Sequence, residues 1–176
     1  IEAKLALRRK LLSSVNKAFS VVDCFSGSNE SIWSKLRCEF ELSEYLALDT
    51  KRKRNRLKID SLKFLKTQKW MFDVIDLDAY GSPWDHFFEV LKTNRQNSMI
   101  VFLTIGTSML GGLSKSALLS IGCPENTPIG MHRQLAELAV LSCIARSYEL
   151  GWNIEEALEA PNHGGNARYI GLTLKR

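Results

Sequence analysis

Residues 20–29, Ser-Val-Val-Asp-Cys-Phe-Ser-Gly-Ser-Asn, decide the fold class of this chain. A short apolar run closes on an acid and passes into a glycine-containing turn, and residues 28–40 then have a helical pattern. A short apolar run bounded by turn residues is typical of a buried strand. Glycine at such a turn lets the backbone approach a ligand, and the next helix offers free N–H groups there. The stretch therefore predicts a strand, a tight turn and a helix.

The same alternation of strands and helices continues along the 176 residues. Strands are predicted over residues 20–25, 45–49, 57–60, 71–77, 99–104, 154–160 and 167–174. Helices are predicted over residues 1–17, 28–40, 61–69 and 131–148, from Pro83 onward, and briefly in the basic stretch after Thr50. This alternation indicates an α/β fold with a doubly wound, mostly parallel seven-stranded sheet and helices on both faces. The short connection between the last two strands makes the last one antiparallel.

Length and composition limit the remaining classes of protein. The length fits a single domain over residues 1–176, and the 45% hydrophobic and 24% charged residues exclude a disordered or collagen-like chain. No apolar stretch is long enough for a membrane span, so no membrane partner is expected. The four cysteines form no CxxC pair and the three histidines are far apart, which predicts no metal site and a reducing, cytoplasmic location. Residues 106–130, rich in glycine and small polar residues, are predicted to be a long functional connection.

The positive charge of the chain is concentrated in one segment. Residues 51–58 carry six basic side chains and no acid, whereas the rest of the chain has 18 basic and 19 acidic residues. The basic residues are Lys51, Arg52, Lys53, Arg54, Arg56 and Lys58. Such a patch attracts polyanions and contacts phosphates, which predicts a nucleic-acid partner. A solvated helix face is the alternative interpretation.

Acidic residues close four successive predicted strands. They are Asp23, Asp49, Asp60 and the pair Asp76 and Asp78. The carboxyl ends of parallel strands surround a ligand crevice, so these acids are expected to converge there. Asp49 is placed to accept hydrogen bonds from two ribose hydroxyls, and Asp60 to accept one from an adenine amino group. Helix N-capping is the alternative role for Asp23 and Asp60.

The turn at Gly27 separates two classes of nucleotide ligand. It has one glycine where the nicotinamide-dinucleotide fingerprint needs three. It resembles motif I of class I S-adenosylmethionine-dependent methyltransferases, with Asn29 at the family's usual last glycine. Asparagine tolerates left-handed backbone angles. The cofactor residues that the resemblance implies are Asp23, Phe25, Gly27, Asn29, Asp49, Asp60 and Ser61.

A second motif narrows the family. Residues 76–83, Asp-Leu-Asp-Ala-Tyr-Gly-Ser-Pro, closely resemble the Asp-x-Asp-Pro-Phe/Tyr-Gly-Ser-Pro signature of the tRNA guanine N2-dimethyltransferase family. The resemblance implies that Asp78, with the carbonyl of Ala79, orients the target amine and that Tyr80 stacks on the base. Asp76 belongs to the same motif. Ala79 stands where the family has proline, which makes the loop less rigid.

The resemblance implies an S-adenosylmethionine-dependent methyltransferase that acts on an exocyclic base amine of nucleic acid, RNA rather than DNA. It covers the chain from about residue 20 and matches the family's catalytic core only, so a partner subunit could supply further RNA-binding surface. Two alternatives stay open: a DNA amino-methyltransferase, and a binding module of the same fold that has lost catalysis. His86 is expected at the surface, His132 and His163 lie in or beside loops, and Trp84 is interpreted as a stacking or a packing residue.

Overall fold

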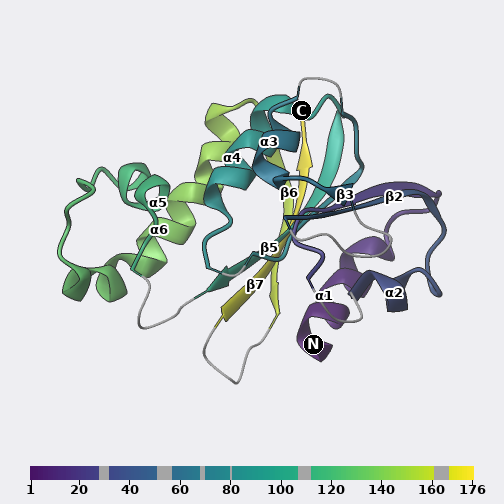
Figure 1. Cartoon of the computed structure of the whole chain (residues 1–176), viewed down its shortest axis with the longest axis horizontal. Coiled ribbons are helices and arrows are strands. Elements are labelled where there is room, and N and C mark those ends of the chain that lie inside the picture. The colour runs from purple at the N-terminus through teal and green to yellow at the C-terminus, as the bar shows by residue number, and fades with distance from the viewer. Residues whose placement is uncertain (28–31, 51–56, 68–69, 80, 107–111, 161–166) are drawn as a thin grey trace.

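The computed structural model describes residues 1–27, 32–50, 57–67, 70–79, 81–106, 112–160 and 167–176 (Figure 1). The described helices are α1 Glu2–Leu12, α2 Ile32–Leu36, α3 Ser61–Leu65, α4 Trp84–Thr93, α5 Lys115–Ser120 and α6 Ile129–Glu149. The described strands are β1 Phe19–Asp23, β2 Leu42–Asp49, β3 Leu57–Lys58, β4 Val74–Leu77, β5 Ser98–Gly106, β6 Asn153–Ala160 and β7 Ala167–Lys175. All seven predicted strands are therefore present.

The strands form one sheet in the order β3-β2-β1-β4-β5-β7-β6. The pairs β1–β2, β2–β3, β1–β4 and β4–β5 are parallel, whereas β7 runs antiparallel to both β5 and β6. The order reverses between β1 and β4, which makes their carboxyl ends the topological switch point where ligands bind in such sheets. The doubly wound, mostly parallel sheet with an antiparallel last strand is confirmed.

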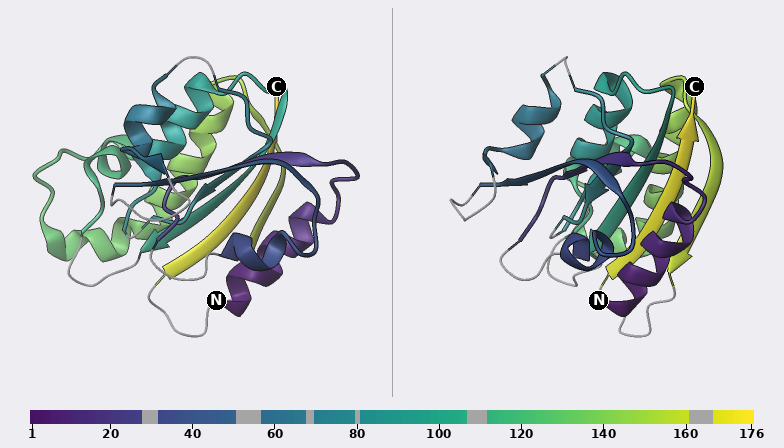
Figure 2. Two further views of the ribbon diagram at one scale, coloured as in Figure 1. Left: turned by 45° about the vertical axis from the view of Figure 1, so that its right-hand side comes forward. Right: turned by 90° about the vertical axis from the view of Figure 1, so that its right-hand side faces the viewer.

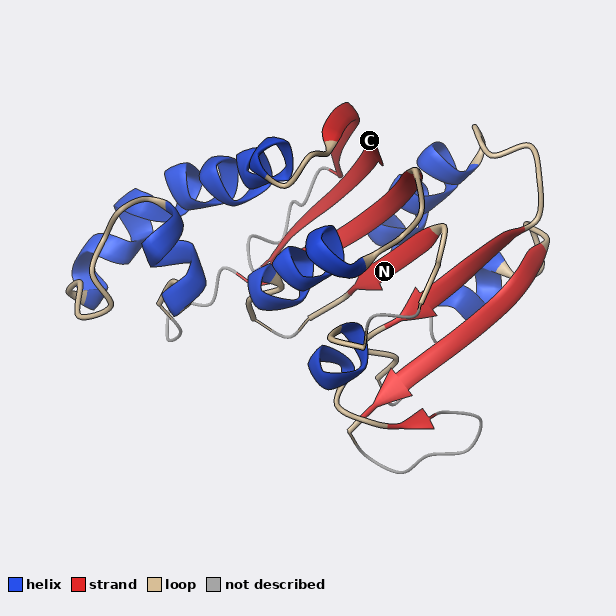
Figure 3. Ribbon diagram, turned by 90° about the horizontal axis from the view of Figure 1, so that it is seen from above, coloured by secondary structure: helices blue, strands red, loops and turns tan. Residues whose placement is uncertain are grey.

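Helices cover both faces of this sheet (Figures 2 and 3). Side chains of successive strand residues point to opposite faces, so each strand contributes to two apolar cores. The core beneath α3, α4 and α6 includes Val22, Ile75, Val101, Phe87 and Cys143. The core beneath α1 and α2 includes Val21, Val74, Phe102, Leu12 and Trp33. Because Asp23 and Asp76 alternate with residues of the first core, they point toward α1 and α2.

Two segments differ from the sequence prediction. The glycine-containing connection contains a helix, α5, whose N-cap Ser114 accepts a hydrogen bond from the backbone N–H of Ala117. Helix α6 begins at Ile129, two residues before the predicted start, and leaves one side exposed at Met131, Leu138, Leu141 and Tyr148. Its first half and α5 extend beyond the sheet (Figure 1), so that only part of the helix has a strand to pack against. In the part of the chain that the structure describes, no helix is both long and apolar enough to span a bilayer.

Candidate active site at the carboxyl edge of the sheet

The strand register brings the predicted acids to one edge of the sheet. Asp23, at the end of β1, pairs with Ala47 of β2 on one side and with Asp76 of β4 on the other. Asp49 and Asp78 each lie two residues beyond those partners, past the same edge. The acids at the ends of these three neighbouring strands therefore lie at one edge of the sheet.

Asp76 is sealed beneath helix α1. Its side chain accepts two hydrogen bonds from the Arg8 guanidinium, at 2.9 Å from Nε to Oδ2 and 2.6 Å from Nη2 to Oδ1. Trp33 Nε1 donates a third, at 2.6 Å to Oδ2. Asp76 and Arg8 are only 2% and 1% exposed. This carboxylate therefore anchors α1 and α2 to the sheet and supports the loop that follows β4.

Asp23 lies between this anchor and the glycine turn. It accepts a hydrogen bond from the Tyr45 hydroxyl at 3.0 Å and one from the backbone N–H of Phe25 at 3.2 Å. Burial and the neighbouring negative charge of Asp76 raise the pKa of Asp23 to about 7. The hydrogen bond from Phe25 turns the chain toward Gly27.

Asp78 is more open than Asp76. Lys4 Nζ donates to its Oδ1 at 2.5 Å, and the side chains of Lys4 and Asp78 are 17% and 27% exposed. Burial acts to raise the pKa of Asp78, but the hydrogen bond and charge of Lys4, with a hydrogen bond from Thr104, outweigh it and hold the pKa below its ordinary value. Asp78 is therefore an ionised acceptor at the edge of the sheet.

The loop after Asp78 is held by the end of β5. The backbone N–H of Gly106 donates to the carbonyl of Gly81 at 2.7 Å. A Cβ on Gly106 would lie 3.0 Å from the Gly81 Cα, a closer approach than nine in ten real Cβ contacts. Gly81 itself has a φ of +114°, which side chains rarely adopt. Both glycines are thus required for the path that presents Asp78 and Ala79.

The turn after β1 is open to a ligand. Gly27 has a φ of +59°, and a Cβ built there would contact only the Phe25 carbonyl, at 3.7 Å. No side chain among the described residues fills this position. The backbone can therefore approach a ligand here, as the glycine predicted.

Two residues predicted to bind the cofactor, Phe25 and Ser61, both contact His86. His86 Nε2 lies 3.0 Å from the Ser61 hydroxyl, and the imidazole centroid lies 4.6 Å from the Phe25 ring. Burial lowers the pKa of His86, and its buried Nδ1 has no hydrogen-bond partner among the described residues. A buried unpaired polar atom beside Phe25 and Ser61 fits a ligand with hydrogen-bonding groups. His86 is half-buried and not the surface residue expected, because α4 packs beside α3; its position one turn into a helix gave no signal of this contact.

Other candidates have structural places. Asp60 caps α3 and accepts from the backbone N–H of Lys63 at 2.9 Å, which is the alternative role that the sequence left open. Asp49 is half-buried at the end of β2. Both His132 nitrogens are bonded, Nδ1 accepting from the Leu113 N–H and Nε2 lying 2.9 Å from the Thr127 carbonyl. Trp84 is buried in the core, so packing is its role.

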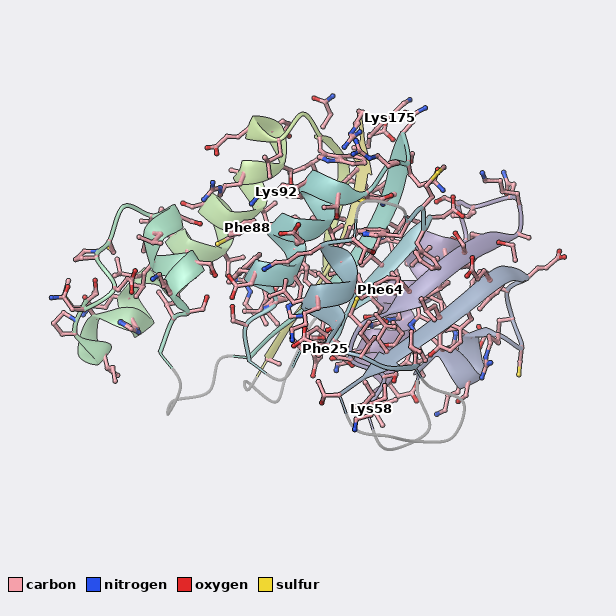
Figure 4. The ribbon with its side chains drawn as sticks, turned by 45° about the horizontal axis from the view of Figure 1, so that its top comes forward. Phe25, Lys58, Phe64, Phe88, Lys92 and Lys175 are labelled. Atoms are coloured by element: carbon pink, nitrogen blue, oxygen red, sulfur yellow. The ribbon has the colours of Figure 1, made fainter. Side chains whose placement is uncertain are left out.

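Several predicted residues lie outside the described part of the chain: Asn29, Tyr80, His163 and residues 51–56. Of the predicted basic segment, the structure describes Lys58, which is exposed at the end of β3, in the strand predicted over residues 57–60. Lys58 and Phe25 lie at the same edge of the sheet (Figure 4). In the described residues no group of histidine, cysteine and acidic side chains could hold a metal ion.

Comparisons by sequence find neither a matching family model nor a matching curated protein. Solved structures do match. Trm1 from Pyrococcus horikoshii, in complex with S-adenosyl-L-methionine, has a TM-score of 0.67 at 14% identity over 99% of this chain and 54% of its own. M. jannaschii TYW2, in complex with AdoMet, has a TM-score of 0.57 at 8% identity; the match covers 100% of this chain and 77% of the TYW2 chain. A Lactococcus lactis chain that carries the name of a hemolysin has a TM-score of 0.62 at 12% identity; the match covers 99% of this chain and 86% of that one.

These likenesses concern the whole described fold. This chain spans about half the length of the Trm1 chain and most of the length of the other two. At such low identity the shared arrangement of strands and helices is what the comparison establishes. The chain therefore has the Rossmann-like fold of S-adenosylmethionine-dependent methyltransferases, with its candidate site at the edge where β1, β2 and β4 end.

Proposed function

We propose that this chain is an S-adenosylmethionine-dependent methyltransferase that acts on an exocyclic base amine of RNA, with guanine in tRNA as the substrate. One observation carries the proposal: an ionised, partly exposed carboxylate, Asp78, follows β4 at the switch point of the sheet, where the neighbouring parallel strand β1 leads into the turn at Gly27. The signature at residues 76–83 supports guanine as the base. The fold match to Trm1 in complex with S-adenosyl-L-methionine supports the cofactor.

The residues around the turn fit the adenosyl group. Gly27 allows backbone approach, and Asp49 offers carboxylate oxygens to ribose hydroxyls. Phe25, Ser61 and His86 form the wall at the adenine end. Asp23, Asn29 and Asp60 complete the predicted set. The bound cofactor supplies an electrophilic methyl group on a sulfonium.

Asp78 handles the target amine. Its carboxylate accepts an N–H of the amine and stabilises the positive charge that develops on nitrogen. The carbonyl of Ala79 accepts the other N–H, and Tyr80 stacks on the base. Alignment and charge complementarity are what such a transfer requires of the protein. Asp76, through Arg8 and Trp33, supports the start of this loop.

The basic segment supplies the RNA contact. In the sequence these basic residues, Lys51, Arg52, Lys53, Arg54, Arg56 and Lys58, come directly after β2, and Lys58 of β3 pairs with Asp49 in the sheet. Several lysine and arginine contacts to phosphates make binding strongly dependent on salt. We propose that RNA lies across this edge, with the target base extruded or already unpaired so that its amine reaches Asp78.

Calorimetric titration with S-adenosylmethionine, followed by transfer of a radiolabelled methyl group to total tRNA and to DNA, tests the proposal. We expect binding and label in tRNA. Asp49→Ala should weaken cofactor binding. The control is Glu156→Gln, at an exposed position of β6, which should leave both cofactor binding and methyl transfer unchanged. Absence of cofactor binding would overturn the proposal. Binding without transfer to either nucleic acid would instead support the non-catalytic alternative.

A further inference from the structure

Lys4 is the side chain that meets the proposed catalytic carboxylate. Its Nζ lies 2.5 Å from Asp78 Oδ1 and 4.9 Å from the centroid of the Tyr169 ring. The contact joins residues 74 positions apart in the sequence, so it depends on where α1 packs. One turn along the helix, Arg8 donates to the Lys4 carbonyl at 3.1 Å and to the sealed Asp76. Lys4 is thus fixed at its backbone, whereas its partly exposed side chain has the flexible four-carbon stem of a lysine.

The ammonium of Lys4 offers Asp78 what a base amine would offer. Both present N–H donors to a carboxylate, and both lie beside an aromatic ring. Lys4 keeps Asp78 ionised while no substrate is present, which offsets the cost of burying a charge. An amine that takes the position of Nζ on this oxygen displaces the Lys4 ammonium. The Tyr169 ring face is a place where the ammonium remains stabilised.

We propose, on the basis of the proposed function, that Lys4 is a positioning residue that occupies the amine subsite of the empty enzyme and is displaced when the target amine binds Asp78. Lys4 therefore competes with the substrate inside the molecule. It sets the apparent affinity for the amine and favours substrates whose amine forms the stronger hydrogen bond. Two charged groups of α1 act on Asp78, Lys4 and Arg8. Arg8 also pairs with Asp76, and the Tyr169 ring of β7 faces the Lys4 ammonium.

The test compares Lys4→Met with Lys10→Met, since Lys10 is an exposed lysine of the same helix. Methyl transfer to total tRNA is measured as a function of RNA concentration and pH. For Lys4→Met we expect KM to fall about two- to fivefold, the effect of removing one partly exposed ion pair. Because kcat/KM reports the free enzyme, its acidic limb should move to higher pH when Lys4 no longer lowers the pKa of Asp78. The acidic limb of kcat should stay in place, since Lys4 has already left Asp78 in the complex.

A second measurement does not need activity. Labelling with an amine-reactive reagent is read by mass spectrometry. In the wild type it should modify Lys4 more slowly than Lys10, and it should modify Lys4 faster in Asp78→Asn than in the wild type. Equal labelling of Lys4 in both proteins, an unchanged KM, or a fall in kcat at every pH would overturn the inference while transfer by the wild type upholds the proposed function. Absence of transfer by the wild type would overturn both.

Discussion

Asp76 and Asp78 lie two residues apart, meet the same helix, and have opposite environments. Asp76 is 2% exposed and receives three hydrogen bonds from Arg8 and Trp33. Asp78 is 27% exposed at its side chain and pairs with the terminal nitrogen of one flexible lysine. The bidentate, buried pair has no room to exchange partners, whereas the single ammonium can be replaced. Helix α1 therefore holds Asp76 in a fixed ion pair with Arg8, whereas its ion pair with Asp78, through Lys4, can be exchanged for another donor.

The largest expected effect is at the sealed pair. Arg8→Met leaves the Asp76 charge buried without its partner, so the free energy of unfolding should fall by about 3–5 kcal/mol. Urea unfolding of the variant measures this. The double variant Arg8→Met, Asp76→Leu, which removes both charges, should recover much of the loss. Equal stability of wild type and Arg8→Met would show that the pair does not anchor α1.

The next effect separates chemistry from stability. Asp78→Asn removes the charge that faces the amine, so the rate of methyl transfer should fall about 100- to 1,000-fold. Cofactor affinity should stay close to that of the wild type, and unfolding should change much less than in Arg8→Met, because Asp78 is partly exposed. Single-turnover transfer and calorimetry measure the two quantities. A comparable loss of cofactor affinity would contradict the separate roles of Asp78 and Asp49.

The sealed Asp76 also affects Asp23, which pairs with it in register. The folded-state pKa of Asp23 is about 7, above its ordinary value of 3.8, so the folded protein holds this proton between those pH values. Stability from this group is fully present below about pH 3.8 and is lost as the pH rises from there through about 7. Asp23→Asn should therefore raise Tm at pH 8 relative to wild type, with a smaller difference at pH 5. A difference independent of pH would refute the raised pKa.

The smallest expected effect is at His86, beside Phe25 and Ser61. His86→Ala removes a ring contact with Phe25 and the bond to Ser61, so S-adenosylmethionine should bind about two- to tenfold more weakly. His86→Phe keeps the ring contact with Phe25 and removes the hydrogen bond to Ser61. Comparing the two variants therefore shows how much cofactor affinity depends on each interaction. Calorimetry measures both. Unchanged affinity in both variants would remove His86 from the proposed cofactor wall.

Much of the molecule follows from local pattern. Apolar runs and turn residues predicted the strands, because period and turn chemistry are properties of neighbouring residues. The short helix α5 was missed because its small polar residues and flanking glycines resemble loop composition. The place of Asp60 at the N-cap of α3 was an alternative that the pattern alone left undecided.

The sequence by itself determined the alternating α/β pattern, the antiparallel final strand and the acids that end the strands. These features depend on residues close together in the chain. Only the tertiary structure decided that Arg8 and Lys4 of α1 meet Asp76 and Asp78, over separations of 68 and 74 residues, and that His86 faces Phe25 and Ser61. Such contacts arise from the packing of helices on a finished sheet, which leaves no periodic signal at either residue.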